Sequence, residues 1–580
     1  MKKRGKTAKW LALSSILPLA AILALPLITY GQPVVDNVPS ESTYSYPPAD
    51  EKPVTLFLKD AERDILYVNP LASVGGNGTS WEHAFTHLQS ALKAAEYGND
   101  IWVASGSYTP VHPGSSGERT DSFHMRNGVG IFGGFPSTGS PNWGQRDWET
   151  CRTVLSGEIG NPGTASDNCY HVFYHPDGLG LDNTAILDGF IITGGFASGP
   201  GAFHVDGGGM HNRPYNSPSI RNCLFTDNSA QGDGGGIFND TASPTIMNCT
   251  FSFNRSGYFG GGIGNYYHSN AAISGCTFRD NRSPYGGGVC NNYYSSAVVT
   301  NSTFVDNVAE SGAGLHNHCD SNATITGCRF IDNYGSESGA GMANGSCVPT
   351  INGCVFSGNQ AAGNDLNGGG GMYNYGSSSP TITNSIFATN TTSNFGGGIY
   401  NHTSGAPVIV NCTIFGNTAK NNGGAVYNRE SSPSIINSIL WNNSSQYSGD
   451  EIYNWASSAV VTYCDIAGGY QGEGNISGTP MFLNPVIGDF HLLPSSPCID
   501  AGSNSAMSAT GIAEDFEGDD RIVCHRVDMG VDEWSVQSCY DRNDTGKIEY
   551  AEMVDALTDY LSGDLPYGRI ICVLMAYLTS

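Results

Sequence analysis

The sequence predicts an all-β solenoid, because its central part repeats every 26 to 27 residues with one longer copy. One copy, Pro218 to Asn239, reads PSIRNCLFTDNSAQGDGGGIFN. An apolar column keeps the register of ten copies: Phe225, Phe251, Phe278, Phe304, Phe330, Phe356, Phe387, Ile414, Leu440 and Ile466. A fixed period of this size indicates coils that cannot bury an apolar face alone and obtain a core by stacking.

Columns next to the phenylalanine predict the strands and corners of each coil. Two positions before it, every copy has Cys or Ser, and alternate residues of a strand point to the same side, so both columns are expected to face the core. Three positions before it, Asn and Gly exchange, as in Asn301 and Gly327, which indicates a left-handed corner. Three positions after it stands a column of asparagines, whose stacked amides are expected to form a ladder along the solenoid axis: Asn228, Asn254, Asn281, Asn307, Asn333, Asn359, Asn390, Asn417 and Asn443.

The remaining side of each coil reads GGGI or a near variant, followed by one residue and Asn, as at Gly234 to Asn239. Short strands separated by Gly and Asn, without helical spacing, indicate a parallel β-helix. The recurring F-x-x-N and GGGI motifs resemble the repeat of the polymorphic outer membrane proteins, a bacterial surface family, over about residues 218–466. The resemblance implies a right-handed, pectin-lyase-like β-helix. The C-terminal autotransporter barrel of that family has no counterpart here, so no transmembrane barrel is expected.

Both ends of the solenoid are expected to carry caps that protect its terminal edges. Thr79 and Glu82 form a capping box, and apolar residues keep helical spacing up to Tyr97, which predicts an N-terminal capping helix. The LYVNP start at Leu66 and the closing FHLLPSSPCIDAGSN, DFEGDDRIV and VDMGVDEW segments resemble the two ends of secreted pectin-lyase-like proteins. We therefore place the β-helix at 64–470 and the C-terminal end of that domain at 471–534.

The N-terminus predicts export. A basic start, an apolar run from Trp10 to Ile28 and small residues before Gln32 are typical of a signal peptide at 1–31. The alternative is an uncleaved membrane anchor, against which Pro18 and Pro26 argue. Residues 32–63 are rich in Pro and polar residues and read as a linker. A secreted or cell-surface location follows.

The charge balance limits the class of partner. The chain has 52 acidic and 26 basic residues, a net charge of -26. Nucleic acid is therefore not expected as a partner. An acidic surface is explained first by solubility. The alternative is a role in high salt or in the presence of divalent cations.

Sixteen cysteines in an exported chain raise the question of disulfides. Those in the inward column are expected to be buried thiols. Pairing is expected instead among flanking cysteines, of which the candidate pairs are Cys151 with Cys169, Cys498 with Cys524, Cys539 with Cys572, and Cys319 with Cys347.

The C-terminal segment 535–580 carries the spacing of an EF-hand calcium loop. Gly546 stands at the sharp turn and Ile548 at the inward apolar position. The expected calcium ligands are Asp541, Asn543, Thr545, Lys547 through its carbonyl, Glu549 and Glu552. Helical patterns follow the loop, so the segment resembles a dockerin-like module, which implies a cohesin-like partner, although only one convincing loop is visible. The alternative is a helical hairpin without an ion.

One candidate ligand surface is a pair of aromatic columns that flank the second asparagine of each coil. Residues directly before and after this asparagine include Tyr373, Tyr400, Tyr427, Tyr453, Tyr375, His402 and Trp455. If these rings face outward, they can stack on sugars of an extracellular glycan. The alternative is an aromatic ladder that only strengthens the sheet.

An acidic column is the second candidate surface. Asp280, Asp306 and Asp332 follow one another on consecutive coils, where like charges raise each other's pKa. The plainer interpretation is that Asp suits the position before a turn. No catalytic motif is recognised and no catalytic residue is assigned. The sequence thus favours a non-catalytic β-helix that binds glycan or another cell-surface component, and the alternative is a polysaccharide lyase or glycoside hydrolase on the same fold.

Overall fold

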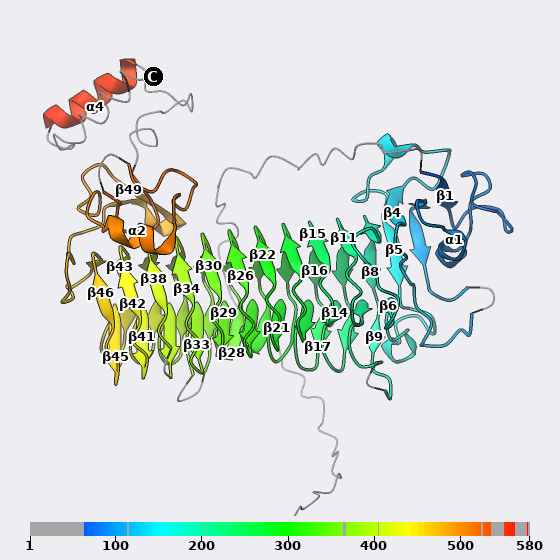
Figure 1. The fold of residues 1–580 in the computed structure, drawn as a ribbon, viewed down its shortest axis with the longest axis horizontal. Coiled ribbons are helices and arrows are strands. Elements are labelled where there is room, and N and C mark those ends of the chain that lie inside the picture. Colours follow the sequence, from blue (N-terminus) through cyan, green and yellow to red (C-terminus); the bar gives the residue numbers. More distant parts are fainter. Residues whose placement is uncertain are drawn as a thin grey trace, which may run out of the picture. The chain divides into compact units, whose positions relative to one another are not determined.

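The computed structural model describes residues 63–112, 115–201, 203–363, 367–403, 405–523, 526–534, 550–562 and 577. The predicted signal peptide, nearly all of the linker and the predicted loop ligands from Asp541 to Glu549 lie outside these residues. The described chain is a parallel β-helix, in which each coil adds one strand to each of three long sheets (Figure 1). The predicted β-solenoid is confirmed.

Sheet A is the longest, with 14 strands that pair in the order of the coils. Its strands are β1 (Ile65–Val68), β2 (Asp100–Ala104), β4 (Gly130–Phe135), β7 (Ile186–Asp188), β11 (Ser219–Arg221), β15 (Thr245–Met247), β19 (Ala272–Ser274), β22 (Val298–Thr300), β26 (Thr324–Thr326), β30 (Thr350–Asn352), β34 (Thr381–Thr383), β38 (Val408–Val410), β42 (Ser434–Ile436) and β46 (Val460–Thr462).

Sheet B, with 13 strands, carries the phenylalanine column. Its strands are β3 (Gly106–Tyr108), β5 (Thr153–Ser156), β8 (Ile191–Thr193), β12 (Leu224–Thr226), β16 (Thr250–Ser252), β20 (Thr277–Arg279), β23 (Thr303–Val305), β27 (Arg329–Ile331), β31 (Val355–Ser357), β35 (Ile386–Ala388), β39 (Thr413–Phe415), β43 (Ile439–Trp441) and β47 (Asp465–Ile466).

Sheet C, with 11 strands, follows the GGGI motif. Its strands are β6 (Phe173–His175), β10 (Met210–Asn212), β14 (Ile237–Asp240), β18 (Ile263–Tyr266), β21 (Val289–Asn292), β25 (Leu315–His318), β29 (Met342–Gly345), β33 (Met372–Tyr375), β37 (Ile399–His402), β41 (Val426–Arg429) and β45 (Ile452–Trp455).

Smaller elements complete the coils and their ends. One short parallel sheet contains β9 (Phe196–Ala197), β13 (Ser229–Ala230) and β17 (Arg255–Ser256). A second contains β24 (Val308–Ser311), β28 (Tyr334–Ser338), β32 (Gln360–Ala361), β36 (Thr391–Thr392), β40 (Thr418–Ala419) and β44 (Ser444–Ser445). An antiparallel pair follows the last coil, β48 (Phe482–Asn484) and β49 (Asp489–Leu492). The described α-helices are α1 (Leu88–Ala94), α2 (Asn504–Thr510) and α4 (Tyr550–Ser562).

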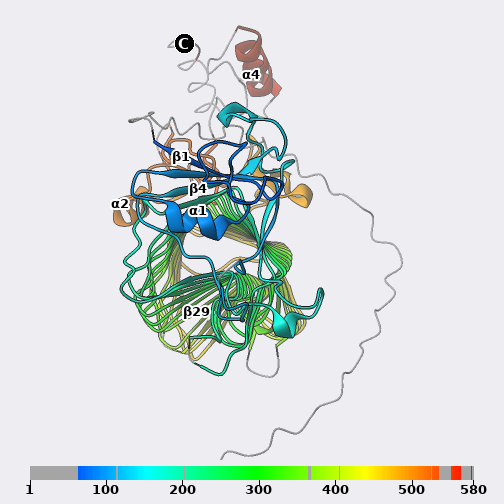
Figure 2. The same cartoon turned by 90° about the vertical axis from the view of Figure 1, so that its right-hand side faces the viewer.

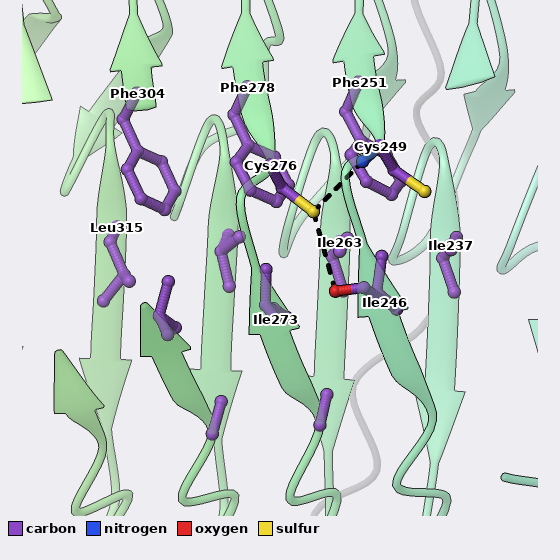
Figure 3. Packing of buried hydrophobic residues seen from close by; sticks show 14 of the residues in the cluster. Ile237, Ile246, Cys249, Phe251, Ile263, Ile273, Cys276, Phe278, Phe304 and Leu315 are labelled. Atoms are coloured by element: carbon purple, nitrogen blue, oxygen red, sulfur yellow. Dashed lines mark hydrogen bonds between the residues drawn. The ribbon is translucent and has the colours of Figure 1, made fainter. Parts of the chain in front are cut away.

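The core is built from the columns that the repeat predicted. Phe304 pairs in register with Phe278 and Phe330, and these rings are fully buried and stacked, with centroids 4.8 and 4.7 Å apart. Figure 3 shows such phenylalanines side by side on neighbouring strands, with the Cys276 thiol packed beside them. The amide of Cys249 donates to the Cys276 Sγ at 3.4 Å. The inward Cys column therefore serves as a row of buried thiols, as predicted.

The predicted asparagine ladder is present. Asn307 Nδ2 donates to Asn333 Oδ1 at 3.0 Å, and the next coils repeat this bond. At the last coil, Asn443 Nδ2 donates instead to the Glu451 carboxylate at 2.6 Å, so a glutamate occupies the place of the next amide. A second ladder, not predicted, runs inside sheet C, where Asn401 Nδ2 donates to Asn428 Oδ1 at 2.9 Å.

The corner position with exchanging Asn and Gly is left-handed, as predicted: Asn301 has φ 46° and Gly327 has φ 62°. The predicted helix from Thr79 to Tyr97, in contrast, is mostly wrong. Only α1 is helical, because Phe85 bridges the first strand instead, with its amide donating to the Tyr67 carbonyl at 2.8 Å. In Figure 2, α1 lies in front of the first coils, so a shorter capping helix remains.

Two of the expected disulfides are wrong. Cys151, Cys169, Cys319 and Cys347 are free thiols. Cys498 is also free, and its thiol donates to the Asp465 carboxylate at 3.1 Å. The other cysteines of the expected pairs, which are Cys524, Cys539 and Cys572, lie outside the described residues.

Candidate functional site

The tyrosine column of sheet C points away from the core but is covered. Along β37, Ile399 and Asn401 face inward, and Tyr400 lies between them on the outer side. Tyr373, Tyr400 and Tyr427 are nevertheless only 7%, 0% and 5% exposed and form a cluster of their own. The expectation that these three rings present open faces to a sugar is therefore wrong.

The side chain that covers these tyrosines belongs to the segment directly before the GGGI motif of β37. Phe395 stacks on Tyr427, with ring centroids 4.5 Å apart, and contacts Tyr400 edge-on at 6.1 Å. Tyr400 also packs against Tyr373 and Tyr427 at 5.1 and 5.0 Å. The column is an aromatic ladder that strengthens the sheet, which was the alternative interpretation.

The other predicted binding residues remain partly accessible. Tyr375, His402 and Tyr453 are half-buried, and Trp455 is exposed. The Tyr373 hydroxyl and His402 Nδ1 lie 3.0 Å apart. Burial, followed by the Arg429 charge, lowers the pKa of His402, so its imidazole is neutral at neutral pH. Hydrogen bonds thus connect His402 to Tyr373 and Tyr375 to His316, and Tyr453 stacks on Tyr427.

A second group of aromatic residues is exposed at the corner that follows sheet C. We call Tyr266, Tyr267, His268, Tyr293 and Tyr294 the aromatic corner. Tyr267, Tyr293 and Tyr294 are 50%, 41% and 47% exposed. The rings of His268 and Tyr294 stack at 5.2 Å with an interplanar angle of 13°, and Tyr266 meets Tyr293 at 5.4 Å. Two adjacent coils thus present a continuous aromatic surface to solvent.

The aromatic corner is not demanded by the fold. Tyr267 and Tyr294 have φ 53° and 62°, a left-handed conformation that bulky side chains rarely adopt. Other coils place Ser346 or Gly376 at the position of Tyr267. The same left-handed backbone recurs at this corner in other coils, for example at Thr241 and Thr403, so the conformation belongs to the coil. What distinguishes these two coils is the set of exposed aromatic side chains.

An acid pair lies next to the aromatic corner. Asp206 accepts a hydrogen bond from the Asp233 amide at 2.7 Å, and Asp233 accepts one from the Phe259 amide at 3.1 Å. Burial, and then the neighbouring charge, raises the pKa of Asp233 to about 7, and burial raises the pKa of Asp206 to about 6. Burial raises the pKa of Tyr266 as well, and the charges of Tyr293 and Asp233 add to this shift, so Tyr266 lies within electrostatic reach of Asp233.

Sequence reasoning missed both groups, although a signal for the acid pair exists. Asp206 and Asp233 each stand directly before GGG in two successive copies, whereas later copies have other residues there. For the aromatic corner, only Tyr266 belonged to a recognised column. The other rings lie beyond the strand, where the sequence does not reveal exposure.

For the acidic column of Asp280, Asp306 and Asp332, the structure agrees with the interpretation that Asp suits the position before a turn. All three have φ between 51° and 55°, so they occupy a left-handed turn position. Burial and then the preceding Asp raise the pKa of Asp306 and of Asp332. Arg279 pairs with Asp280 at 3.4 Å. These three aspartates are therefore turn residues of the coil.

A pocket of about 500 Å³ lies at the last coil. Trp441, Asp450, Glu451 and Tyr470 line part of it. Burial raises the pKa of Glu451 to about 7, and this carboxylate is already bonded to Asn443. The pocket therefore coincides with the end of the asparagine ladder.

The calcium-loop residues Asp541, Asn543, Thr545, Lys547 and Glu549 lie outside the described residues. Glu552 falls within α4, but its side chain is not described. The first of the two helical patterns expected after the loop is confirmed by α4, whereas nearly all of the second lies outside the described residues. Calcium binding stays a prediction.

Comparison with known proteins supports the fold. A family model described as "Right handed beta helix region" matches residues 208–387, and a model of the Chlamydia polymorphic membrane protein repeat matches residues 411–429. The described chain is therefore a right-handed β-helix. The second match agrees with the repeat resemblance seen in the sequence. No curated protein matches.

Several solved structures are similar to this β-helix protein. Pectate lyase Pel9A is 13% identical, with 81% of this chain and 96% of that chain covered and a TM-score of 0.34. A rhamnogalacturonan lyase is 14% identical, with 79% and 99% covered and a TM-score of 0.32. PfbA, a surface adhesin of Streptococcus pneumoniae, is 11% identical, with 68% and 90% covered and a TM-score of 0.30. At these values the likenesses say nothing about the ligand of this chain.

Proposed function

We propose that this protein is a secreted or cell-surface β-helix that binds an extracellular glycan through the aromatic corner. The observation that carries the proposal is the exposure of four aromatic rings on two adjacent coils, Tyr267, His268, Tyr293 and Tyr294, beside the half-buried Tyr266. Two later coils have the small residues Ser346 and Gly376 at this corner. Export is supported by the predicted signal peptide. In the described part of the chain no helix is long and apolar enough to cross a membrane.

The chemistry of the corner suits a sugar. Tyrosine and histidine combine a flat apolar face, which can pack against the C–H face of a pyranose, with polar atoms at the ring edge. The neighbouring carboxyls of Asp206 and Asp233 accept hydrogen bonds, and sugar hydroxyls are donors. Open aromatic faces beside carboxyl oxygens match a neutral or amino sugar better than a uronic acid, because the carboxylate of a uronic acid would be repelled by the Asp206–Asp233 pair, which is partly ionised at neutral pH.

Replacing Tyr267 and Tyr294 together by Ala is expected to weaken glycan binding at least tenfold, since each lost ring stacking contributes about 1 kcal/mol. Binding is measured as retardation in affinity electrophoresis through neutral and uronic-acid polysaccharides. Fold retention is checked by circular dichroism, because both side chains are exposed.

Tyr447→Ala is the matched control, because this tyrosine is 71% exposed on another coil. It should bind like the unchanged protein. Equal retardation of the double variant and the unchanged protein would disprove the role of the corner. The unchanged protein is also incubated with each bound polysaccharide, and retention without new reducing ends or ultraviolet-absorbing products agrees with binding alone.

The second candidate function is a polysaccharide lyase or hydrolase, and the acid pair favours it. A carboxyl with a pKa near 7 suits a general acid, and hydrolases on sugars use two carboxyl groups. In that case the incubations above yield products, and Asp233→Asn, which keeps an acceptor for the Phe259 amide, abolishes them.

We further propose that the segment 535–580 binds calcium and docks a cohesin-like partner. Glu552→Gln in the full chain removes one charge and the expected bidentate ligand, so calcium affinity should fall at least tenfold. Calorimetric titration measures this change. The proposal fails if the unchanged chain takes up no calcium at millimolar concentration, or if the variant binds as tightly.

A further inference from the structure

His491, Glu517 and Asp532 come together near the C-terminal end of the described chain, from segments that are distant in sequence. His491 lies on β49, Glu517 follows α2 in a loop, and Asp532 belongs to the VDMGVDEW segment. One ligand atom from each side chain lies within 4.8 Å of the other two. Among the described residues, no other group of His, Cys, Asp and Glu converges in this way.

The imidazole of His491 is oriented toward the two carboxylates. Its Nδ1 lies 2.7 Å from Asp489 Oδ1, and its Nε2 lies 3.9 Å from Glu517 Oε1. A carboxylate on one ring nitrogen is the usual device that fixes the tautomer and direction of a metal-binding histidine. The arrangement leaves Nε2 as the nitrogen free to ligate.

Backbone hydrogen bonds hold the Asp532 carboxylate and the loop that carries Glu517. Asp532 is only 6% exposed, and its Oδ2 accepts the Leu492 amide at 2.8 Å, which leaves Oδ1 without a donor among the described residues. Asp515 accepts the Glu517 amide at 2.9 Å through one oxygen and the Glu533 amide at 3.1 Å through the other. One buried aspartate therefore ties together the two loops that carry the carboxylates.

We propose that His491, Glu517 and Asp532 bind a divalent transition-metal ion of the zinc type. One imidazole nitrogen and two carboxylate oxygens are a ligand set that zinc accepts, with a fourth position open to water. Calcium fits less well, because it takes oxygen ligands. Ligand atoms 4.8 Å apart or closer require only a small closure to meet an ion at about 2.0–2.2 Å. The ion would join β49 to both loops.

The test is calorimetric titration of the chelator-treated full chain with Zn²⁺, in calcium excess to occupy the predicted EF-hand loop. The unchanged protein is expected to bind one more Zn²⁺ than His491→Gln or Asp532→Asn, or to bind that ion at least 100-fold more tightly. The side-chain amide introduced by Asp532→Asn can still accept the Leu492 amide through its oxygen, so this second variant should keep the fold. Zinc uptake by the many thiols is the same in all variants and cancels in the difference.

His83→Gln is the control, because this histidine is exposed and far from the cluster in sequence. It should bind zinc like the unchanged protein. Zinc should also raise the melting temperature of the unchanged protein but not of the two cluster variants, because an ion that binds only the folded form stabilises it. Equal stoichiometry and affinity in the unchanged protein and both cluster variants would overturn the proposal.

Discussion

Asn307→Ala is expected to lower the free energy of unfolding by about 3–5 kcal/mol, because it opens the asparagine ladder in the middle of the solenoid. The Nδ2 of Asn307 donates to Asn333 Oδ1 and to the Phe278 carbonyl, at 3.0 and 2.9 Å. Its Oδ1 accepts the amide and the side-chain Nδ2 of Asn281, at 3.1 and 3.0 Å. The Phe278 carbonyl and the Asn281 backbone amide would lose this partner in the interior, and each buried unsatisfied group costs about 1–3 kcal/mol. Asn333 Oδ1 keeps its bond from the backbone amide at position 307, and Asn281 Nδ2 keeps its bond to the Phe251 carbonyl.

Urea unfolding followed by circular dichroism measures the change. Thr324→Ala is the control, because Thr324 is an exposed residue on sheet A in the same region of the solenoid. Its loss should be below about 0.5 kcal/mol. A loss below about 1 kcal/mol for Asn307→Ala would mean that water replaces the ladder, and the proposed contribution of the amides to stability would be wrong.

Tyr400→Ala is expected to lower the free energy of unfolding by about 3–5 kcal/mol, the range for large aromatic side chains removed from a core. Tyr400 is fully buried between Tyr373 and Tyr427 and lies under Phe395. Its removal leaves a cavity on the outer side of sheet C. Had the ring been an exposed sugar platform, the same change would leave stability almost untouched.

Tyr400→Phe separates packing from hydrogen bonding. The Tyr400 hydroxyl is buried, and although the Arg429 guanidinium lies beside it, no hydrogen bond of good geometry to the hydroxyl forms among the described residues. Its removal should therefore change the free energy of unfolding by less than about 1 kcal/mol, and burial of a bare ring can even stabilise the fold. Thermal and urea unfolding of both variants give the comparison. A strongly destabilised Phe variant would show that the hydroxyl is bonded after all, and a stable Ala variant would contradict the ladder.

The sequence predicted the repeat architecture well, because the fold depends on columns that each coil presents again. The stacked rings of Phe278, Phe304 and Phe330 and the amide ladder through Asn307 lie where the register of the repeat places them. The exchange of Asn301 with Gly327 indicated a left-handed corner, because few residue types tolerate that backbone. Because equivalent residues of adjacent coils are one repeat apart in the sequence, their contacts can be predicted from a single sequence.

The exposure of side chains on the outer surface could not be predicted in the same way. Alternation along β37 placed Tyr400 outside the core, but a strand pattern does not show that Phe395 covers it. Likewise, Phe85 pairs with the first strand although its neighbourhood has helical spacing, because a backbone partner outweighs a weak local propensity.

The sequence by itself determined the period, the inward columns and the parallel stacking, since all of these repeat from coil to coil. Only the tertiary structure decided which outward side chains are open to a ligand, because exposure depends on cover from segments with no fixed spacing. It also decided that Asp206 and Asp233 lie together within electrostatic reach of Tyr266. The convergence of His491 with Glu517 and Asp532 was likewise beyond the sequence, because three non-repeating segments meet there and no periodicity relates them.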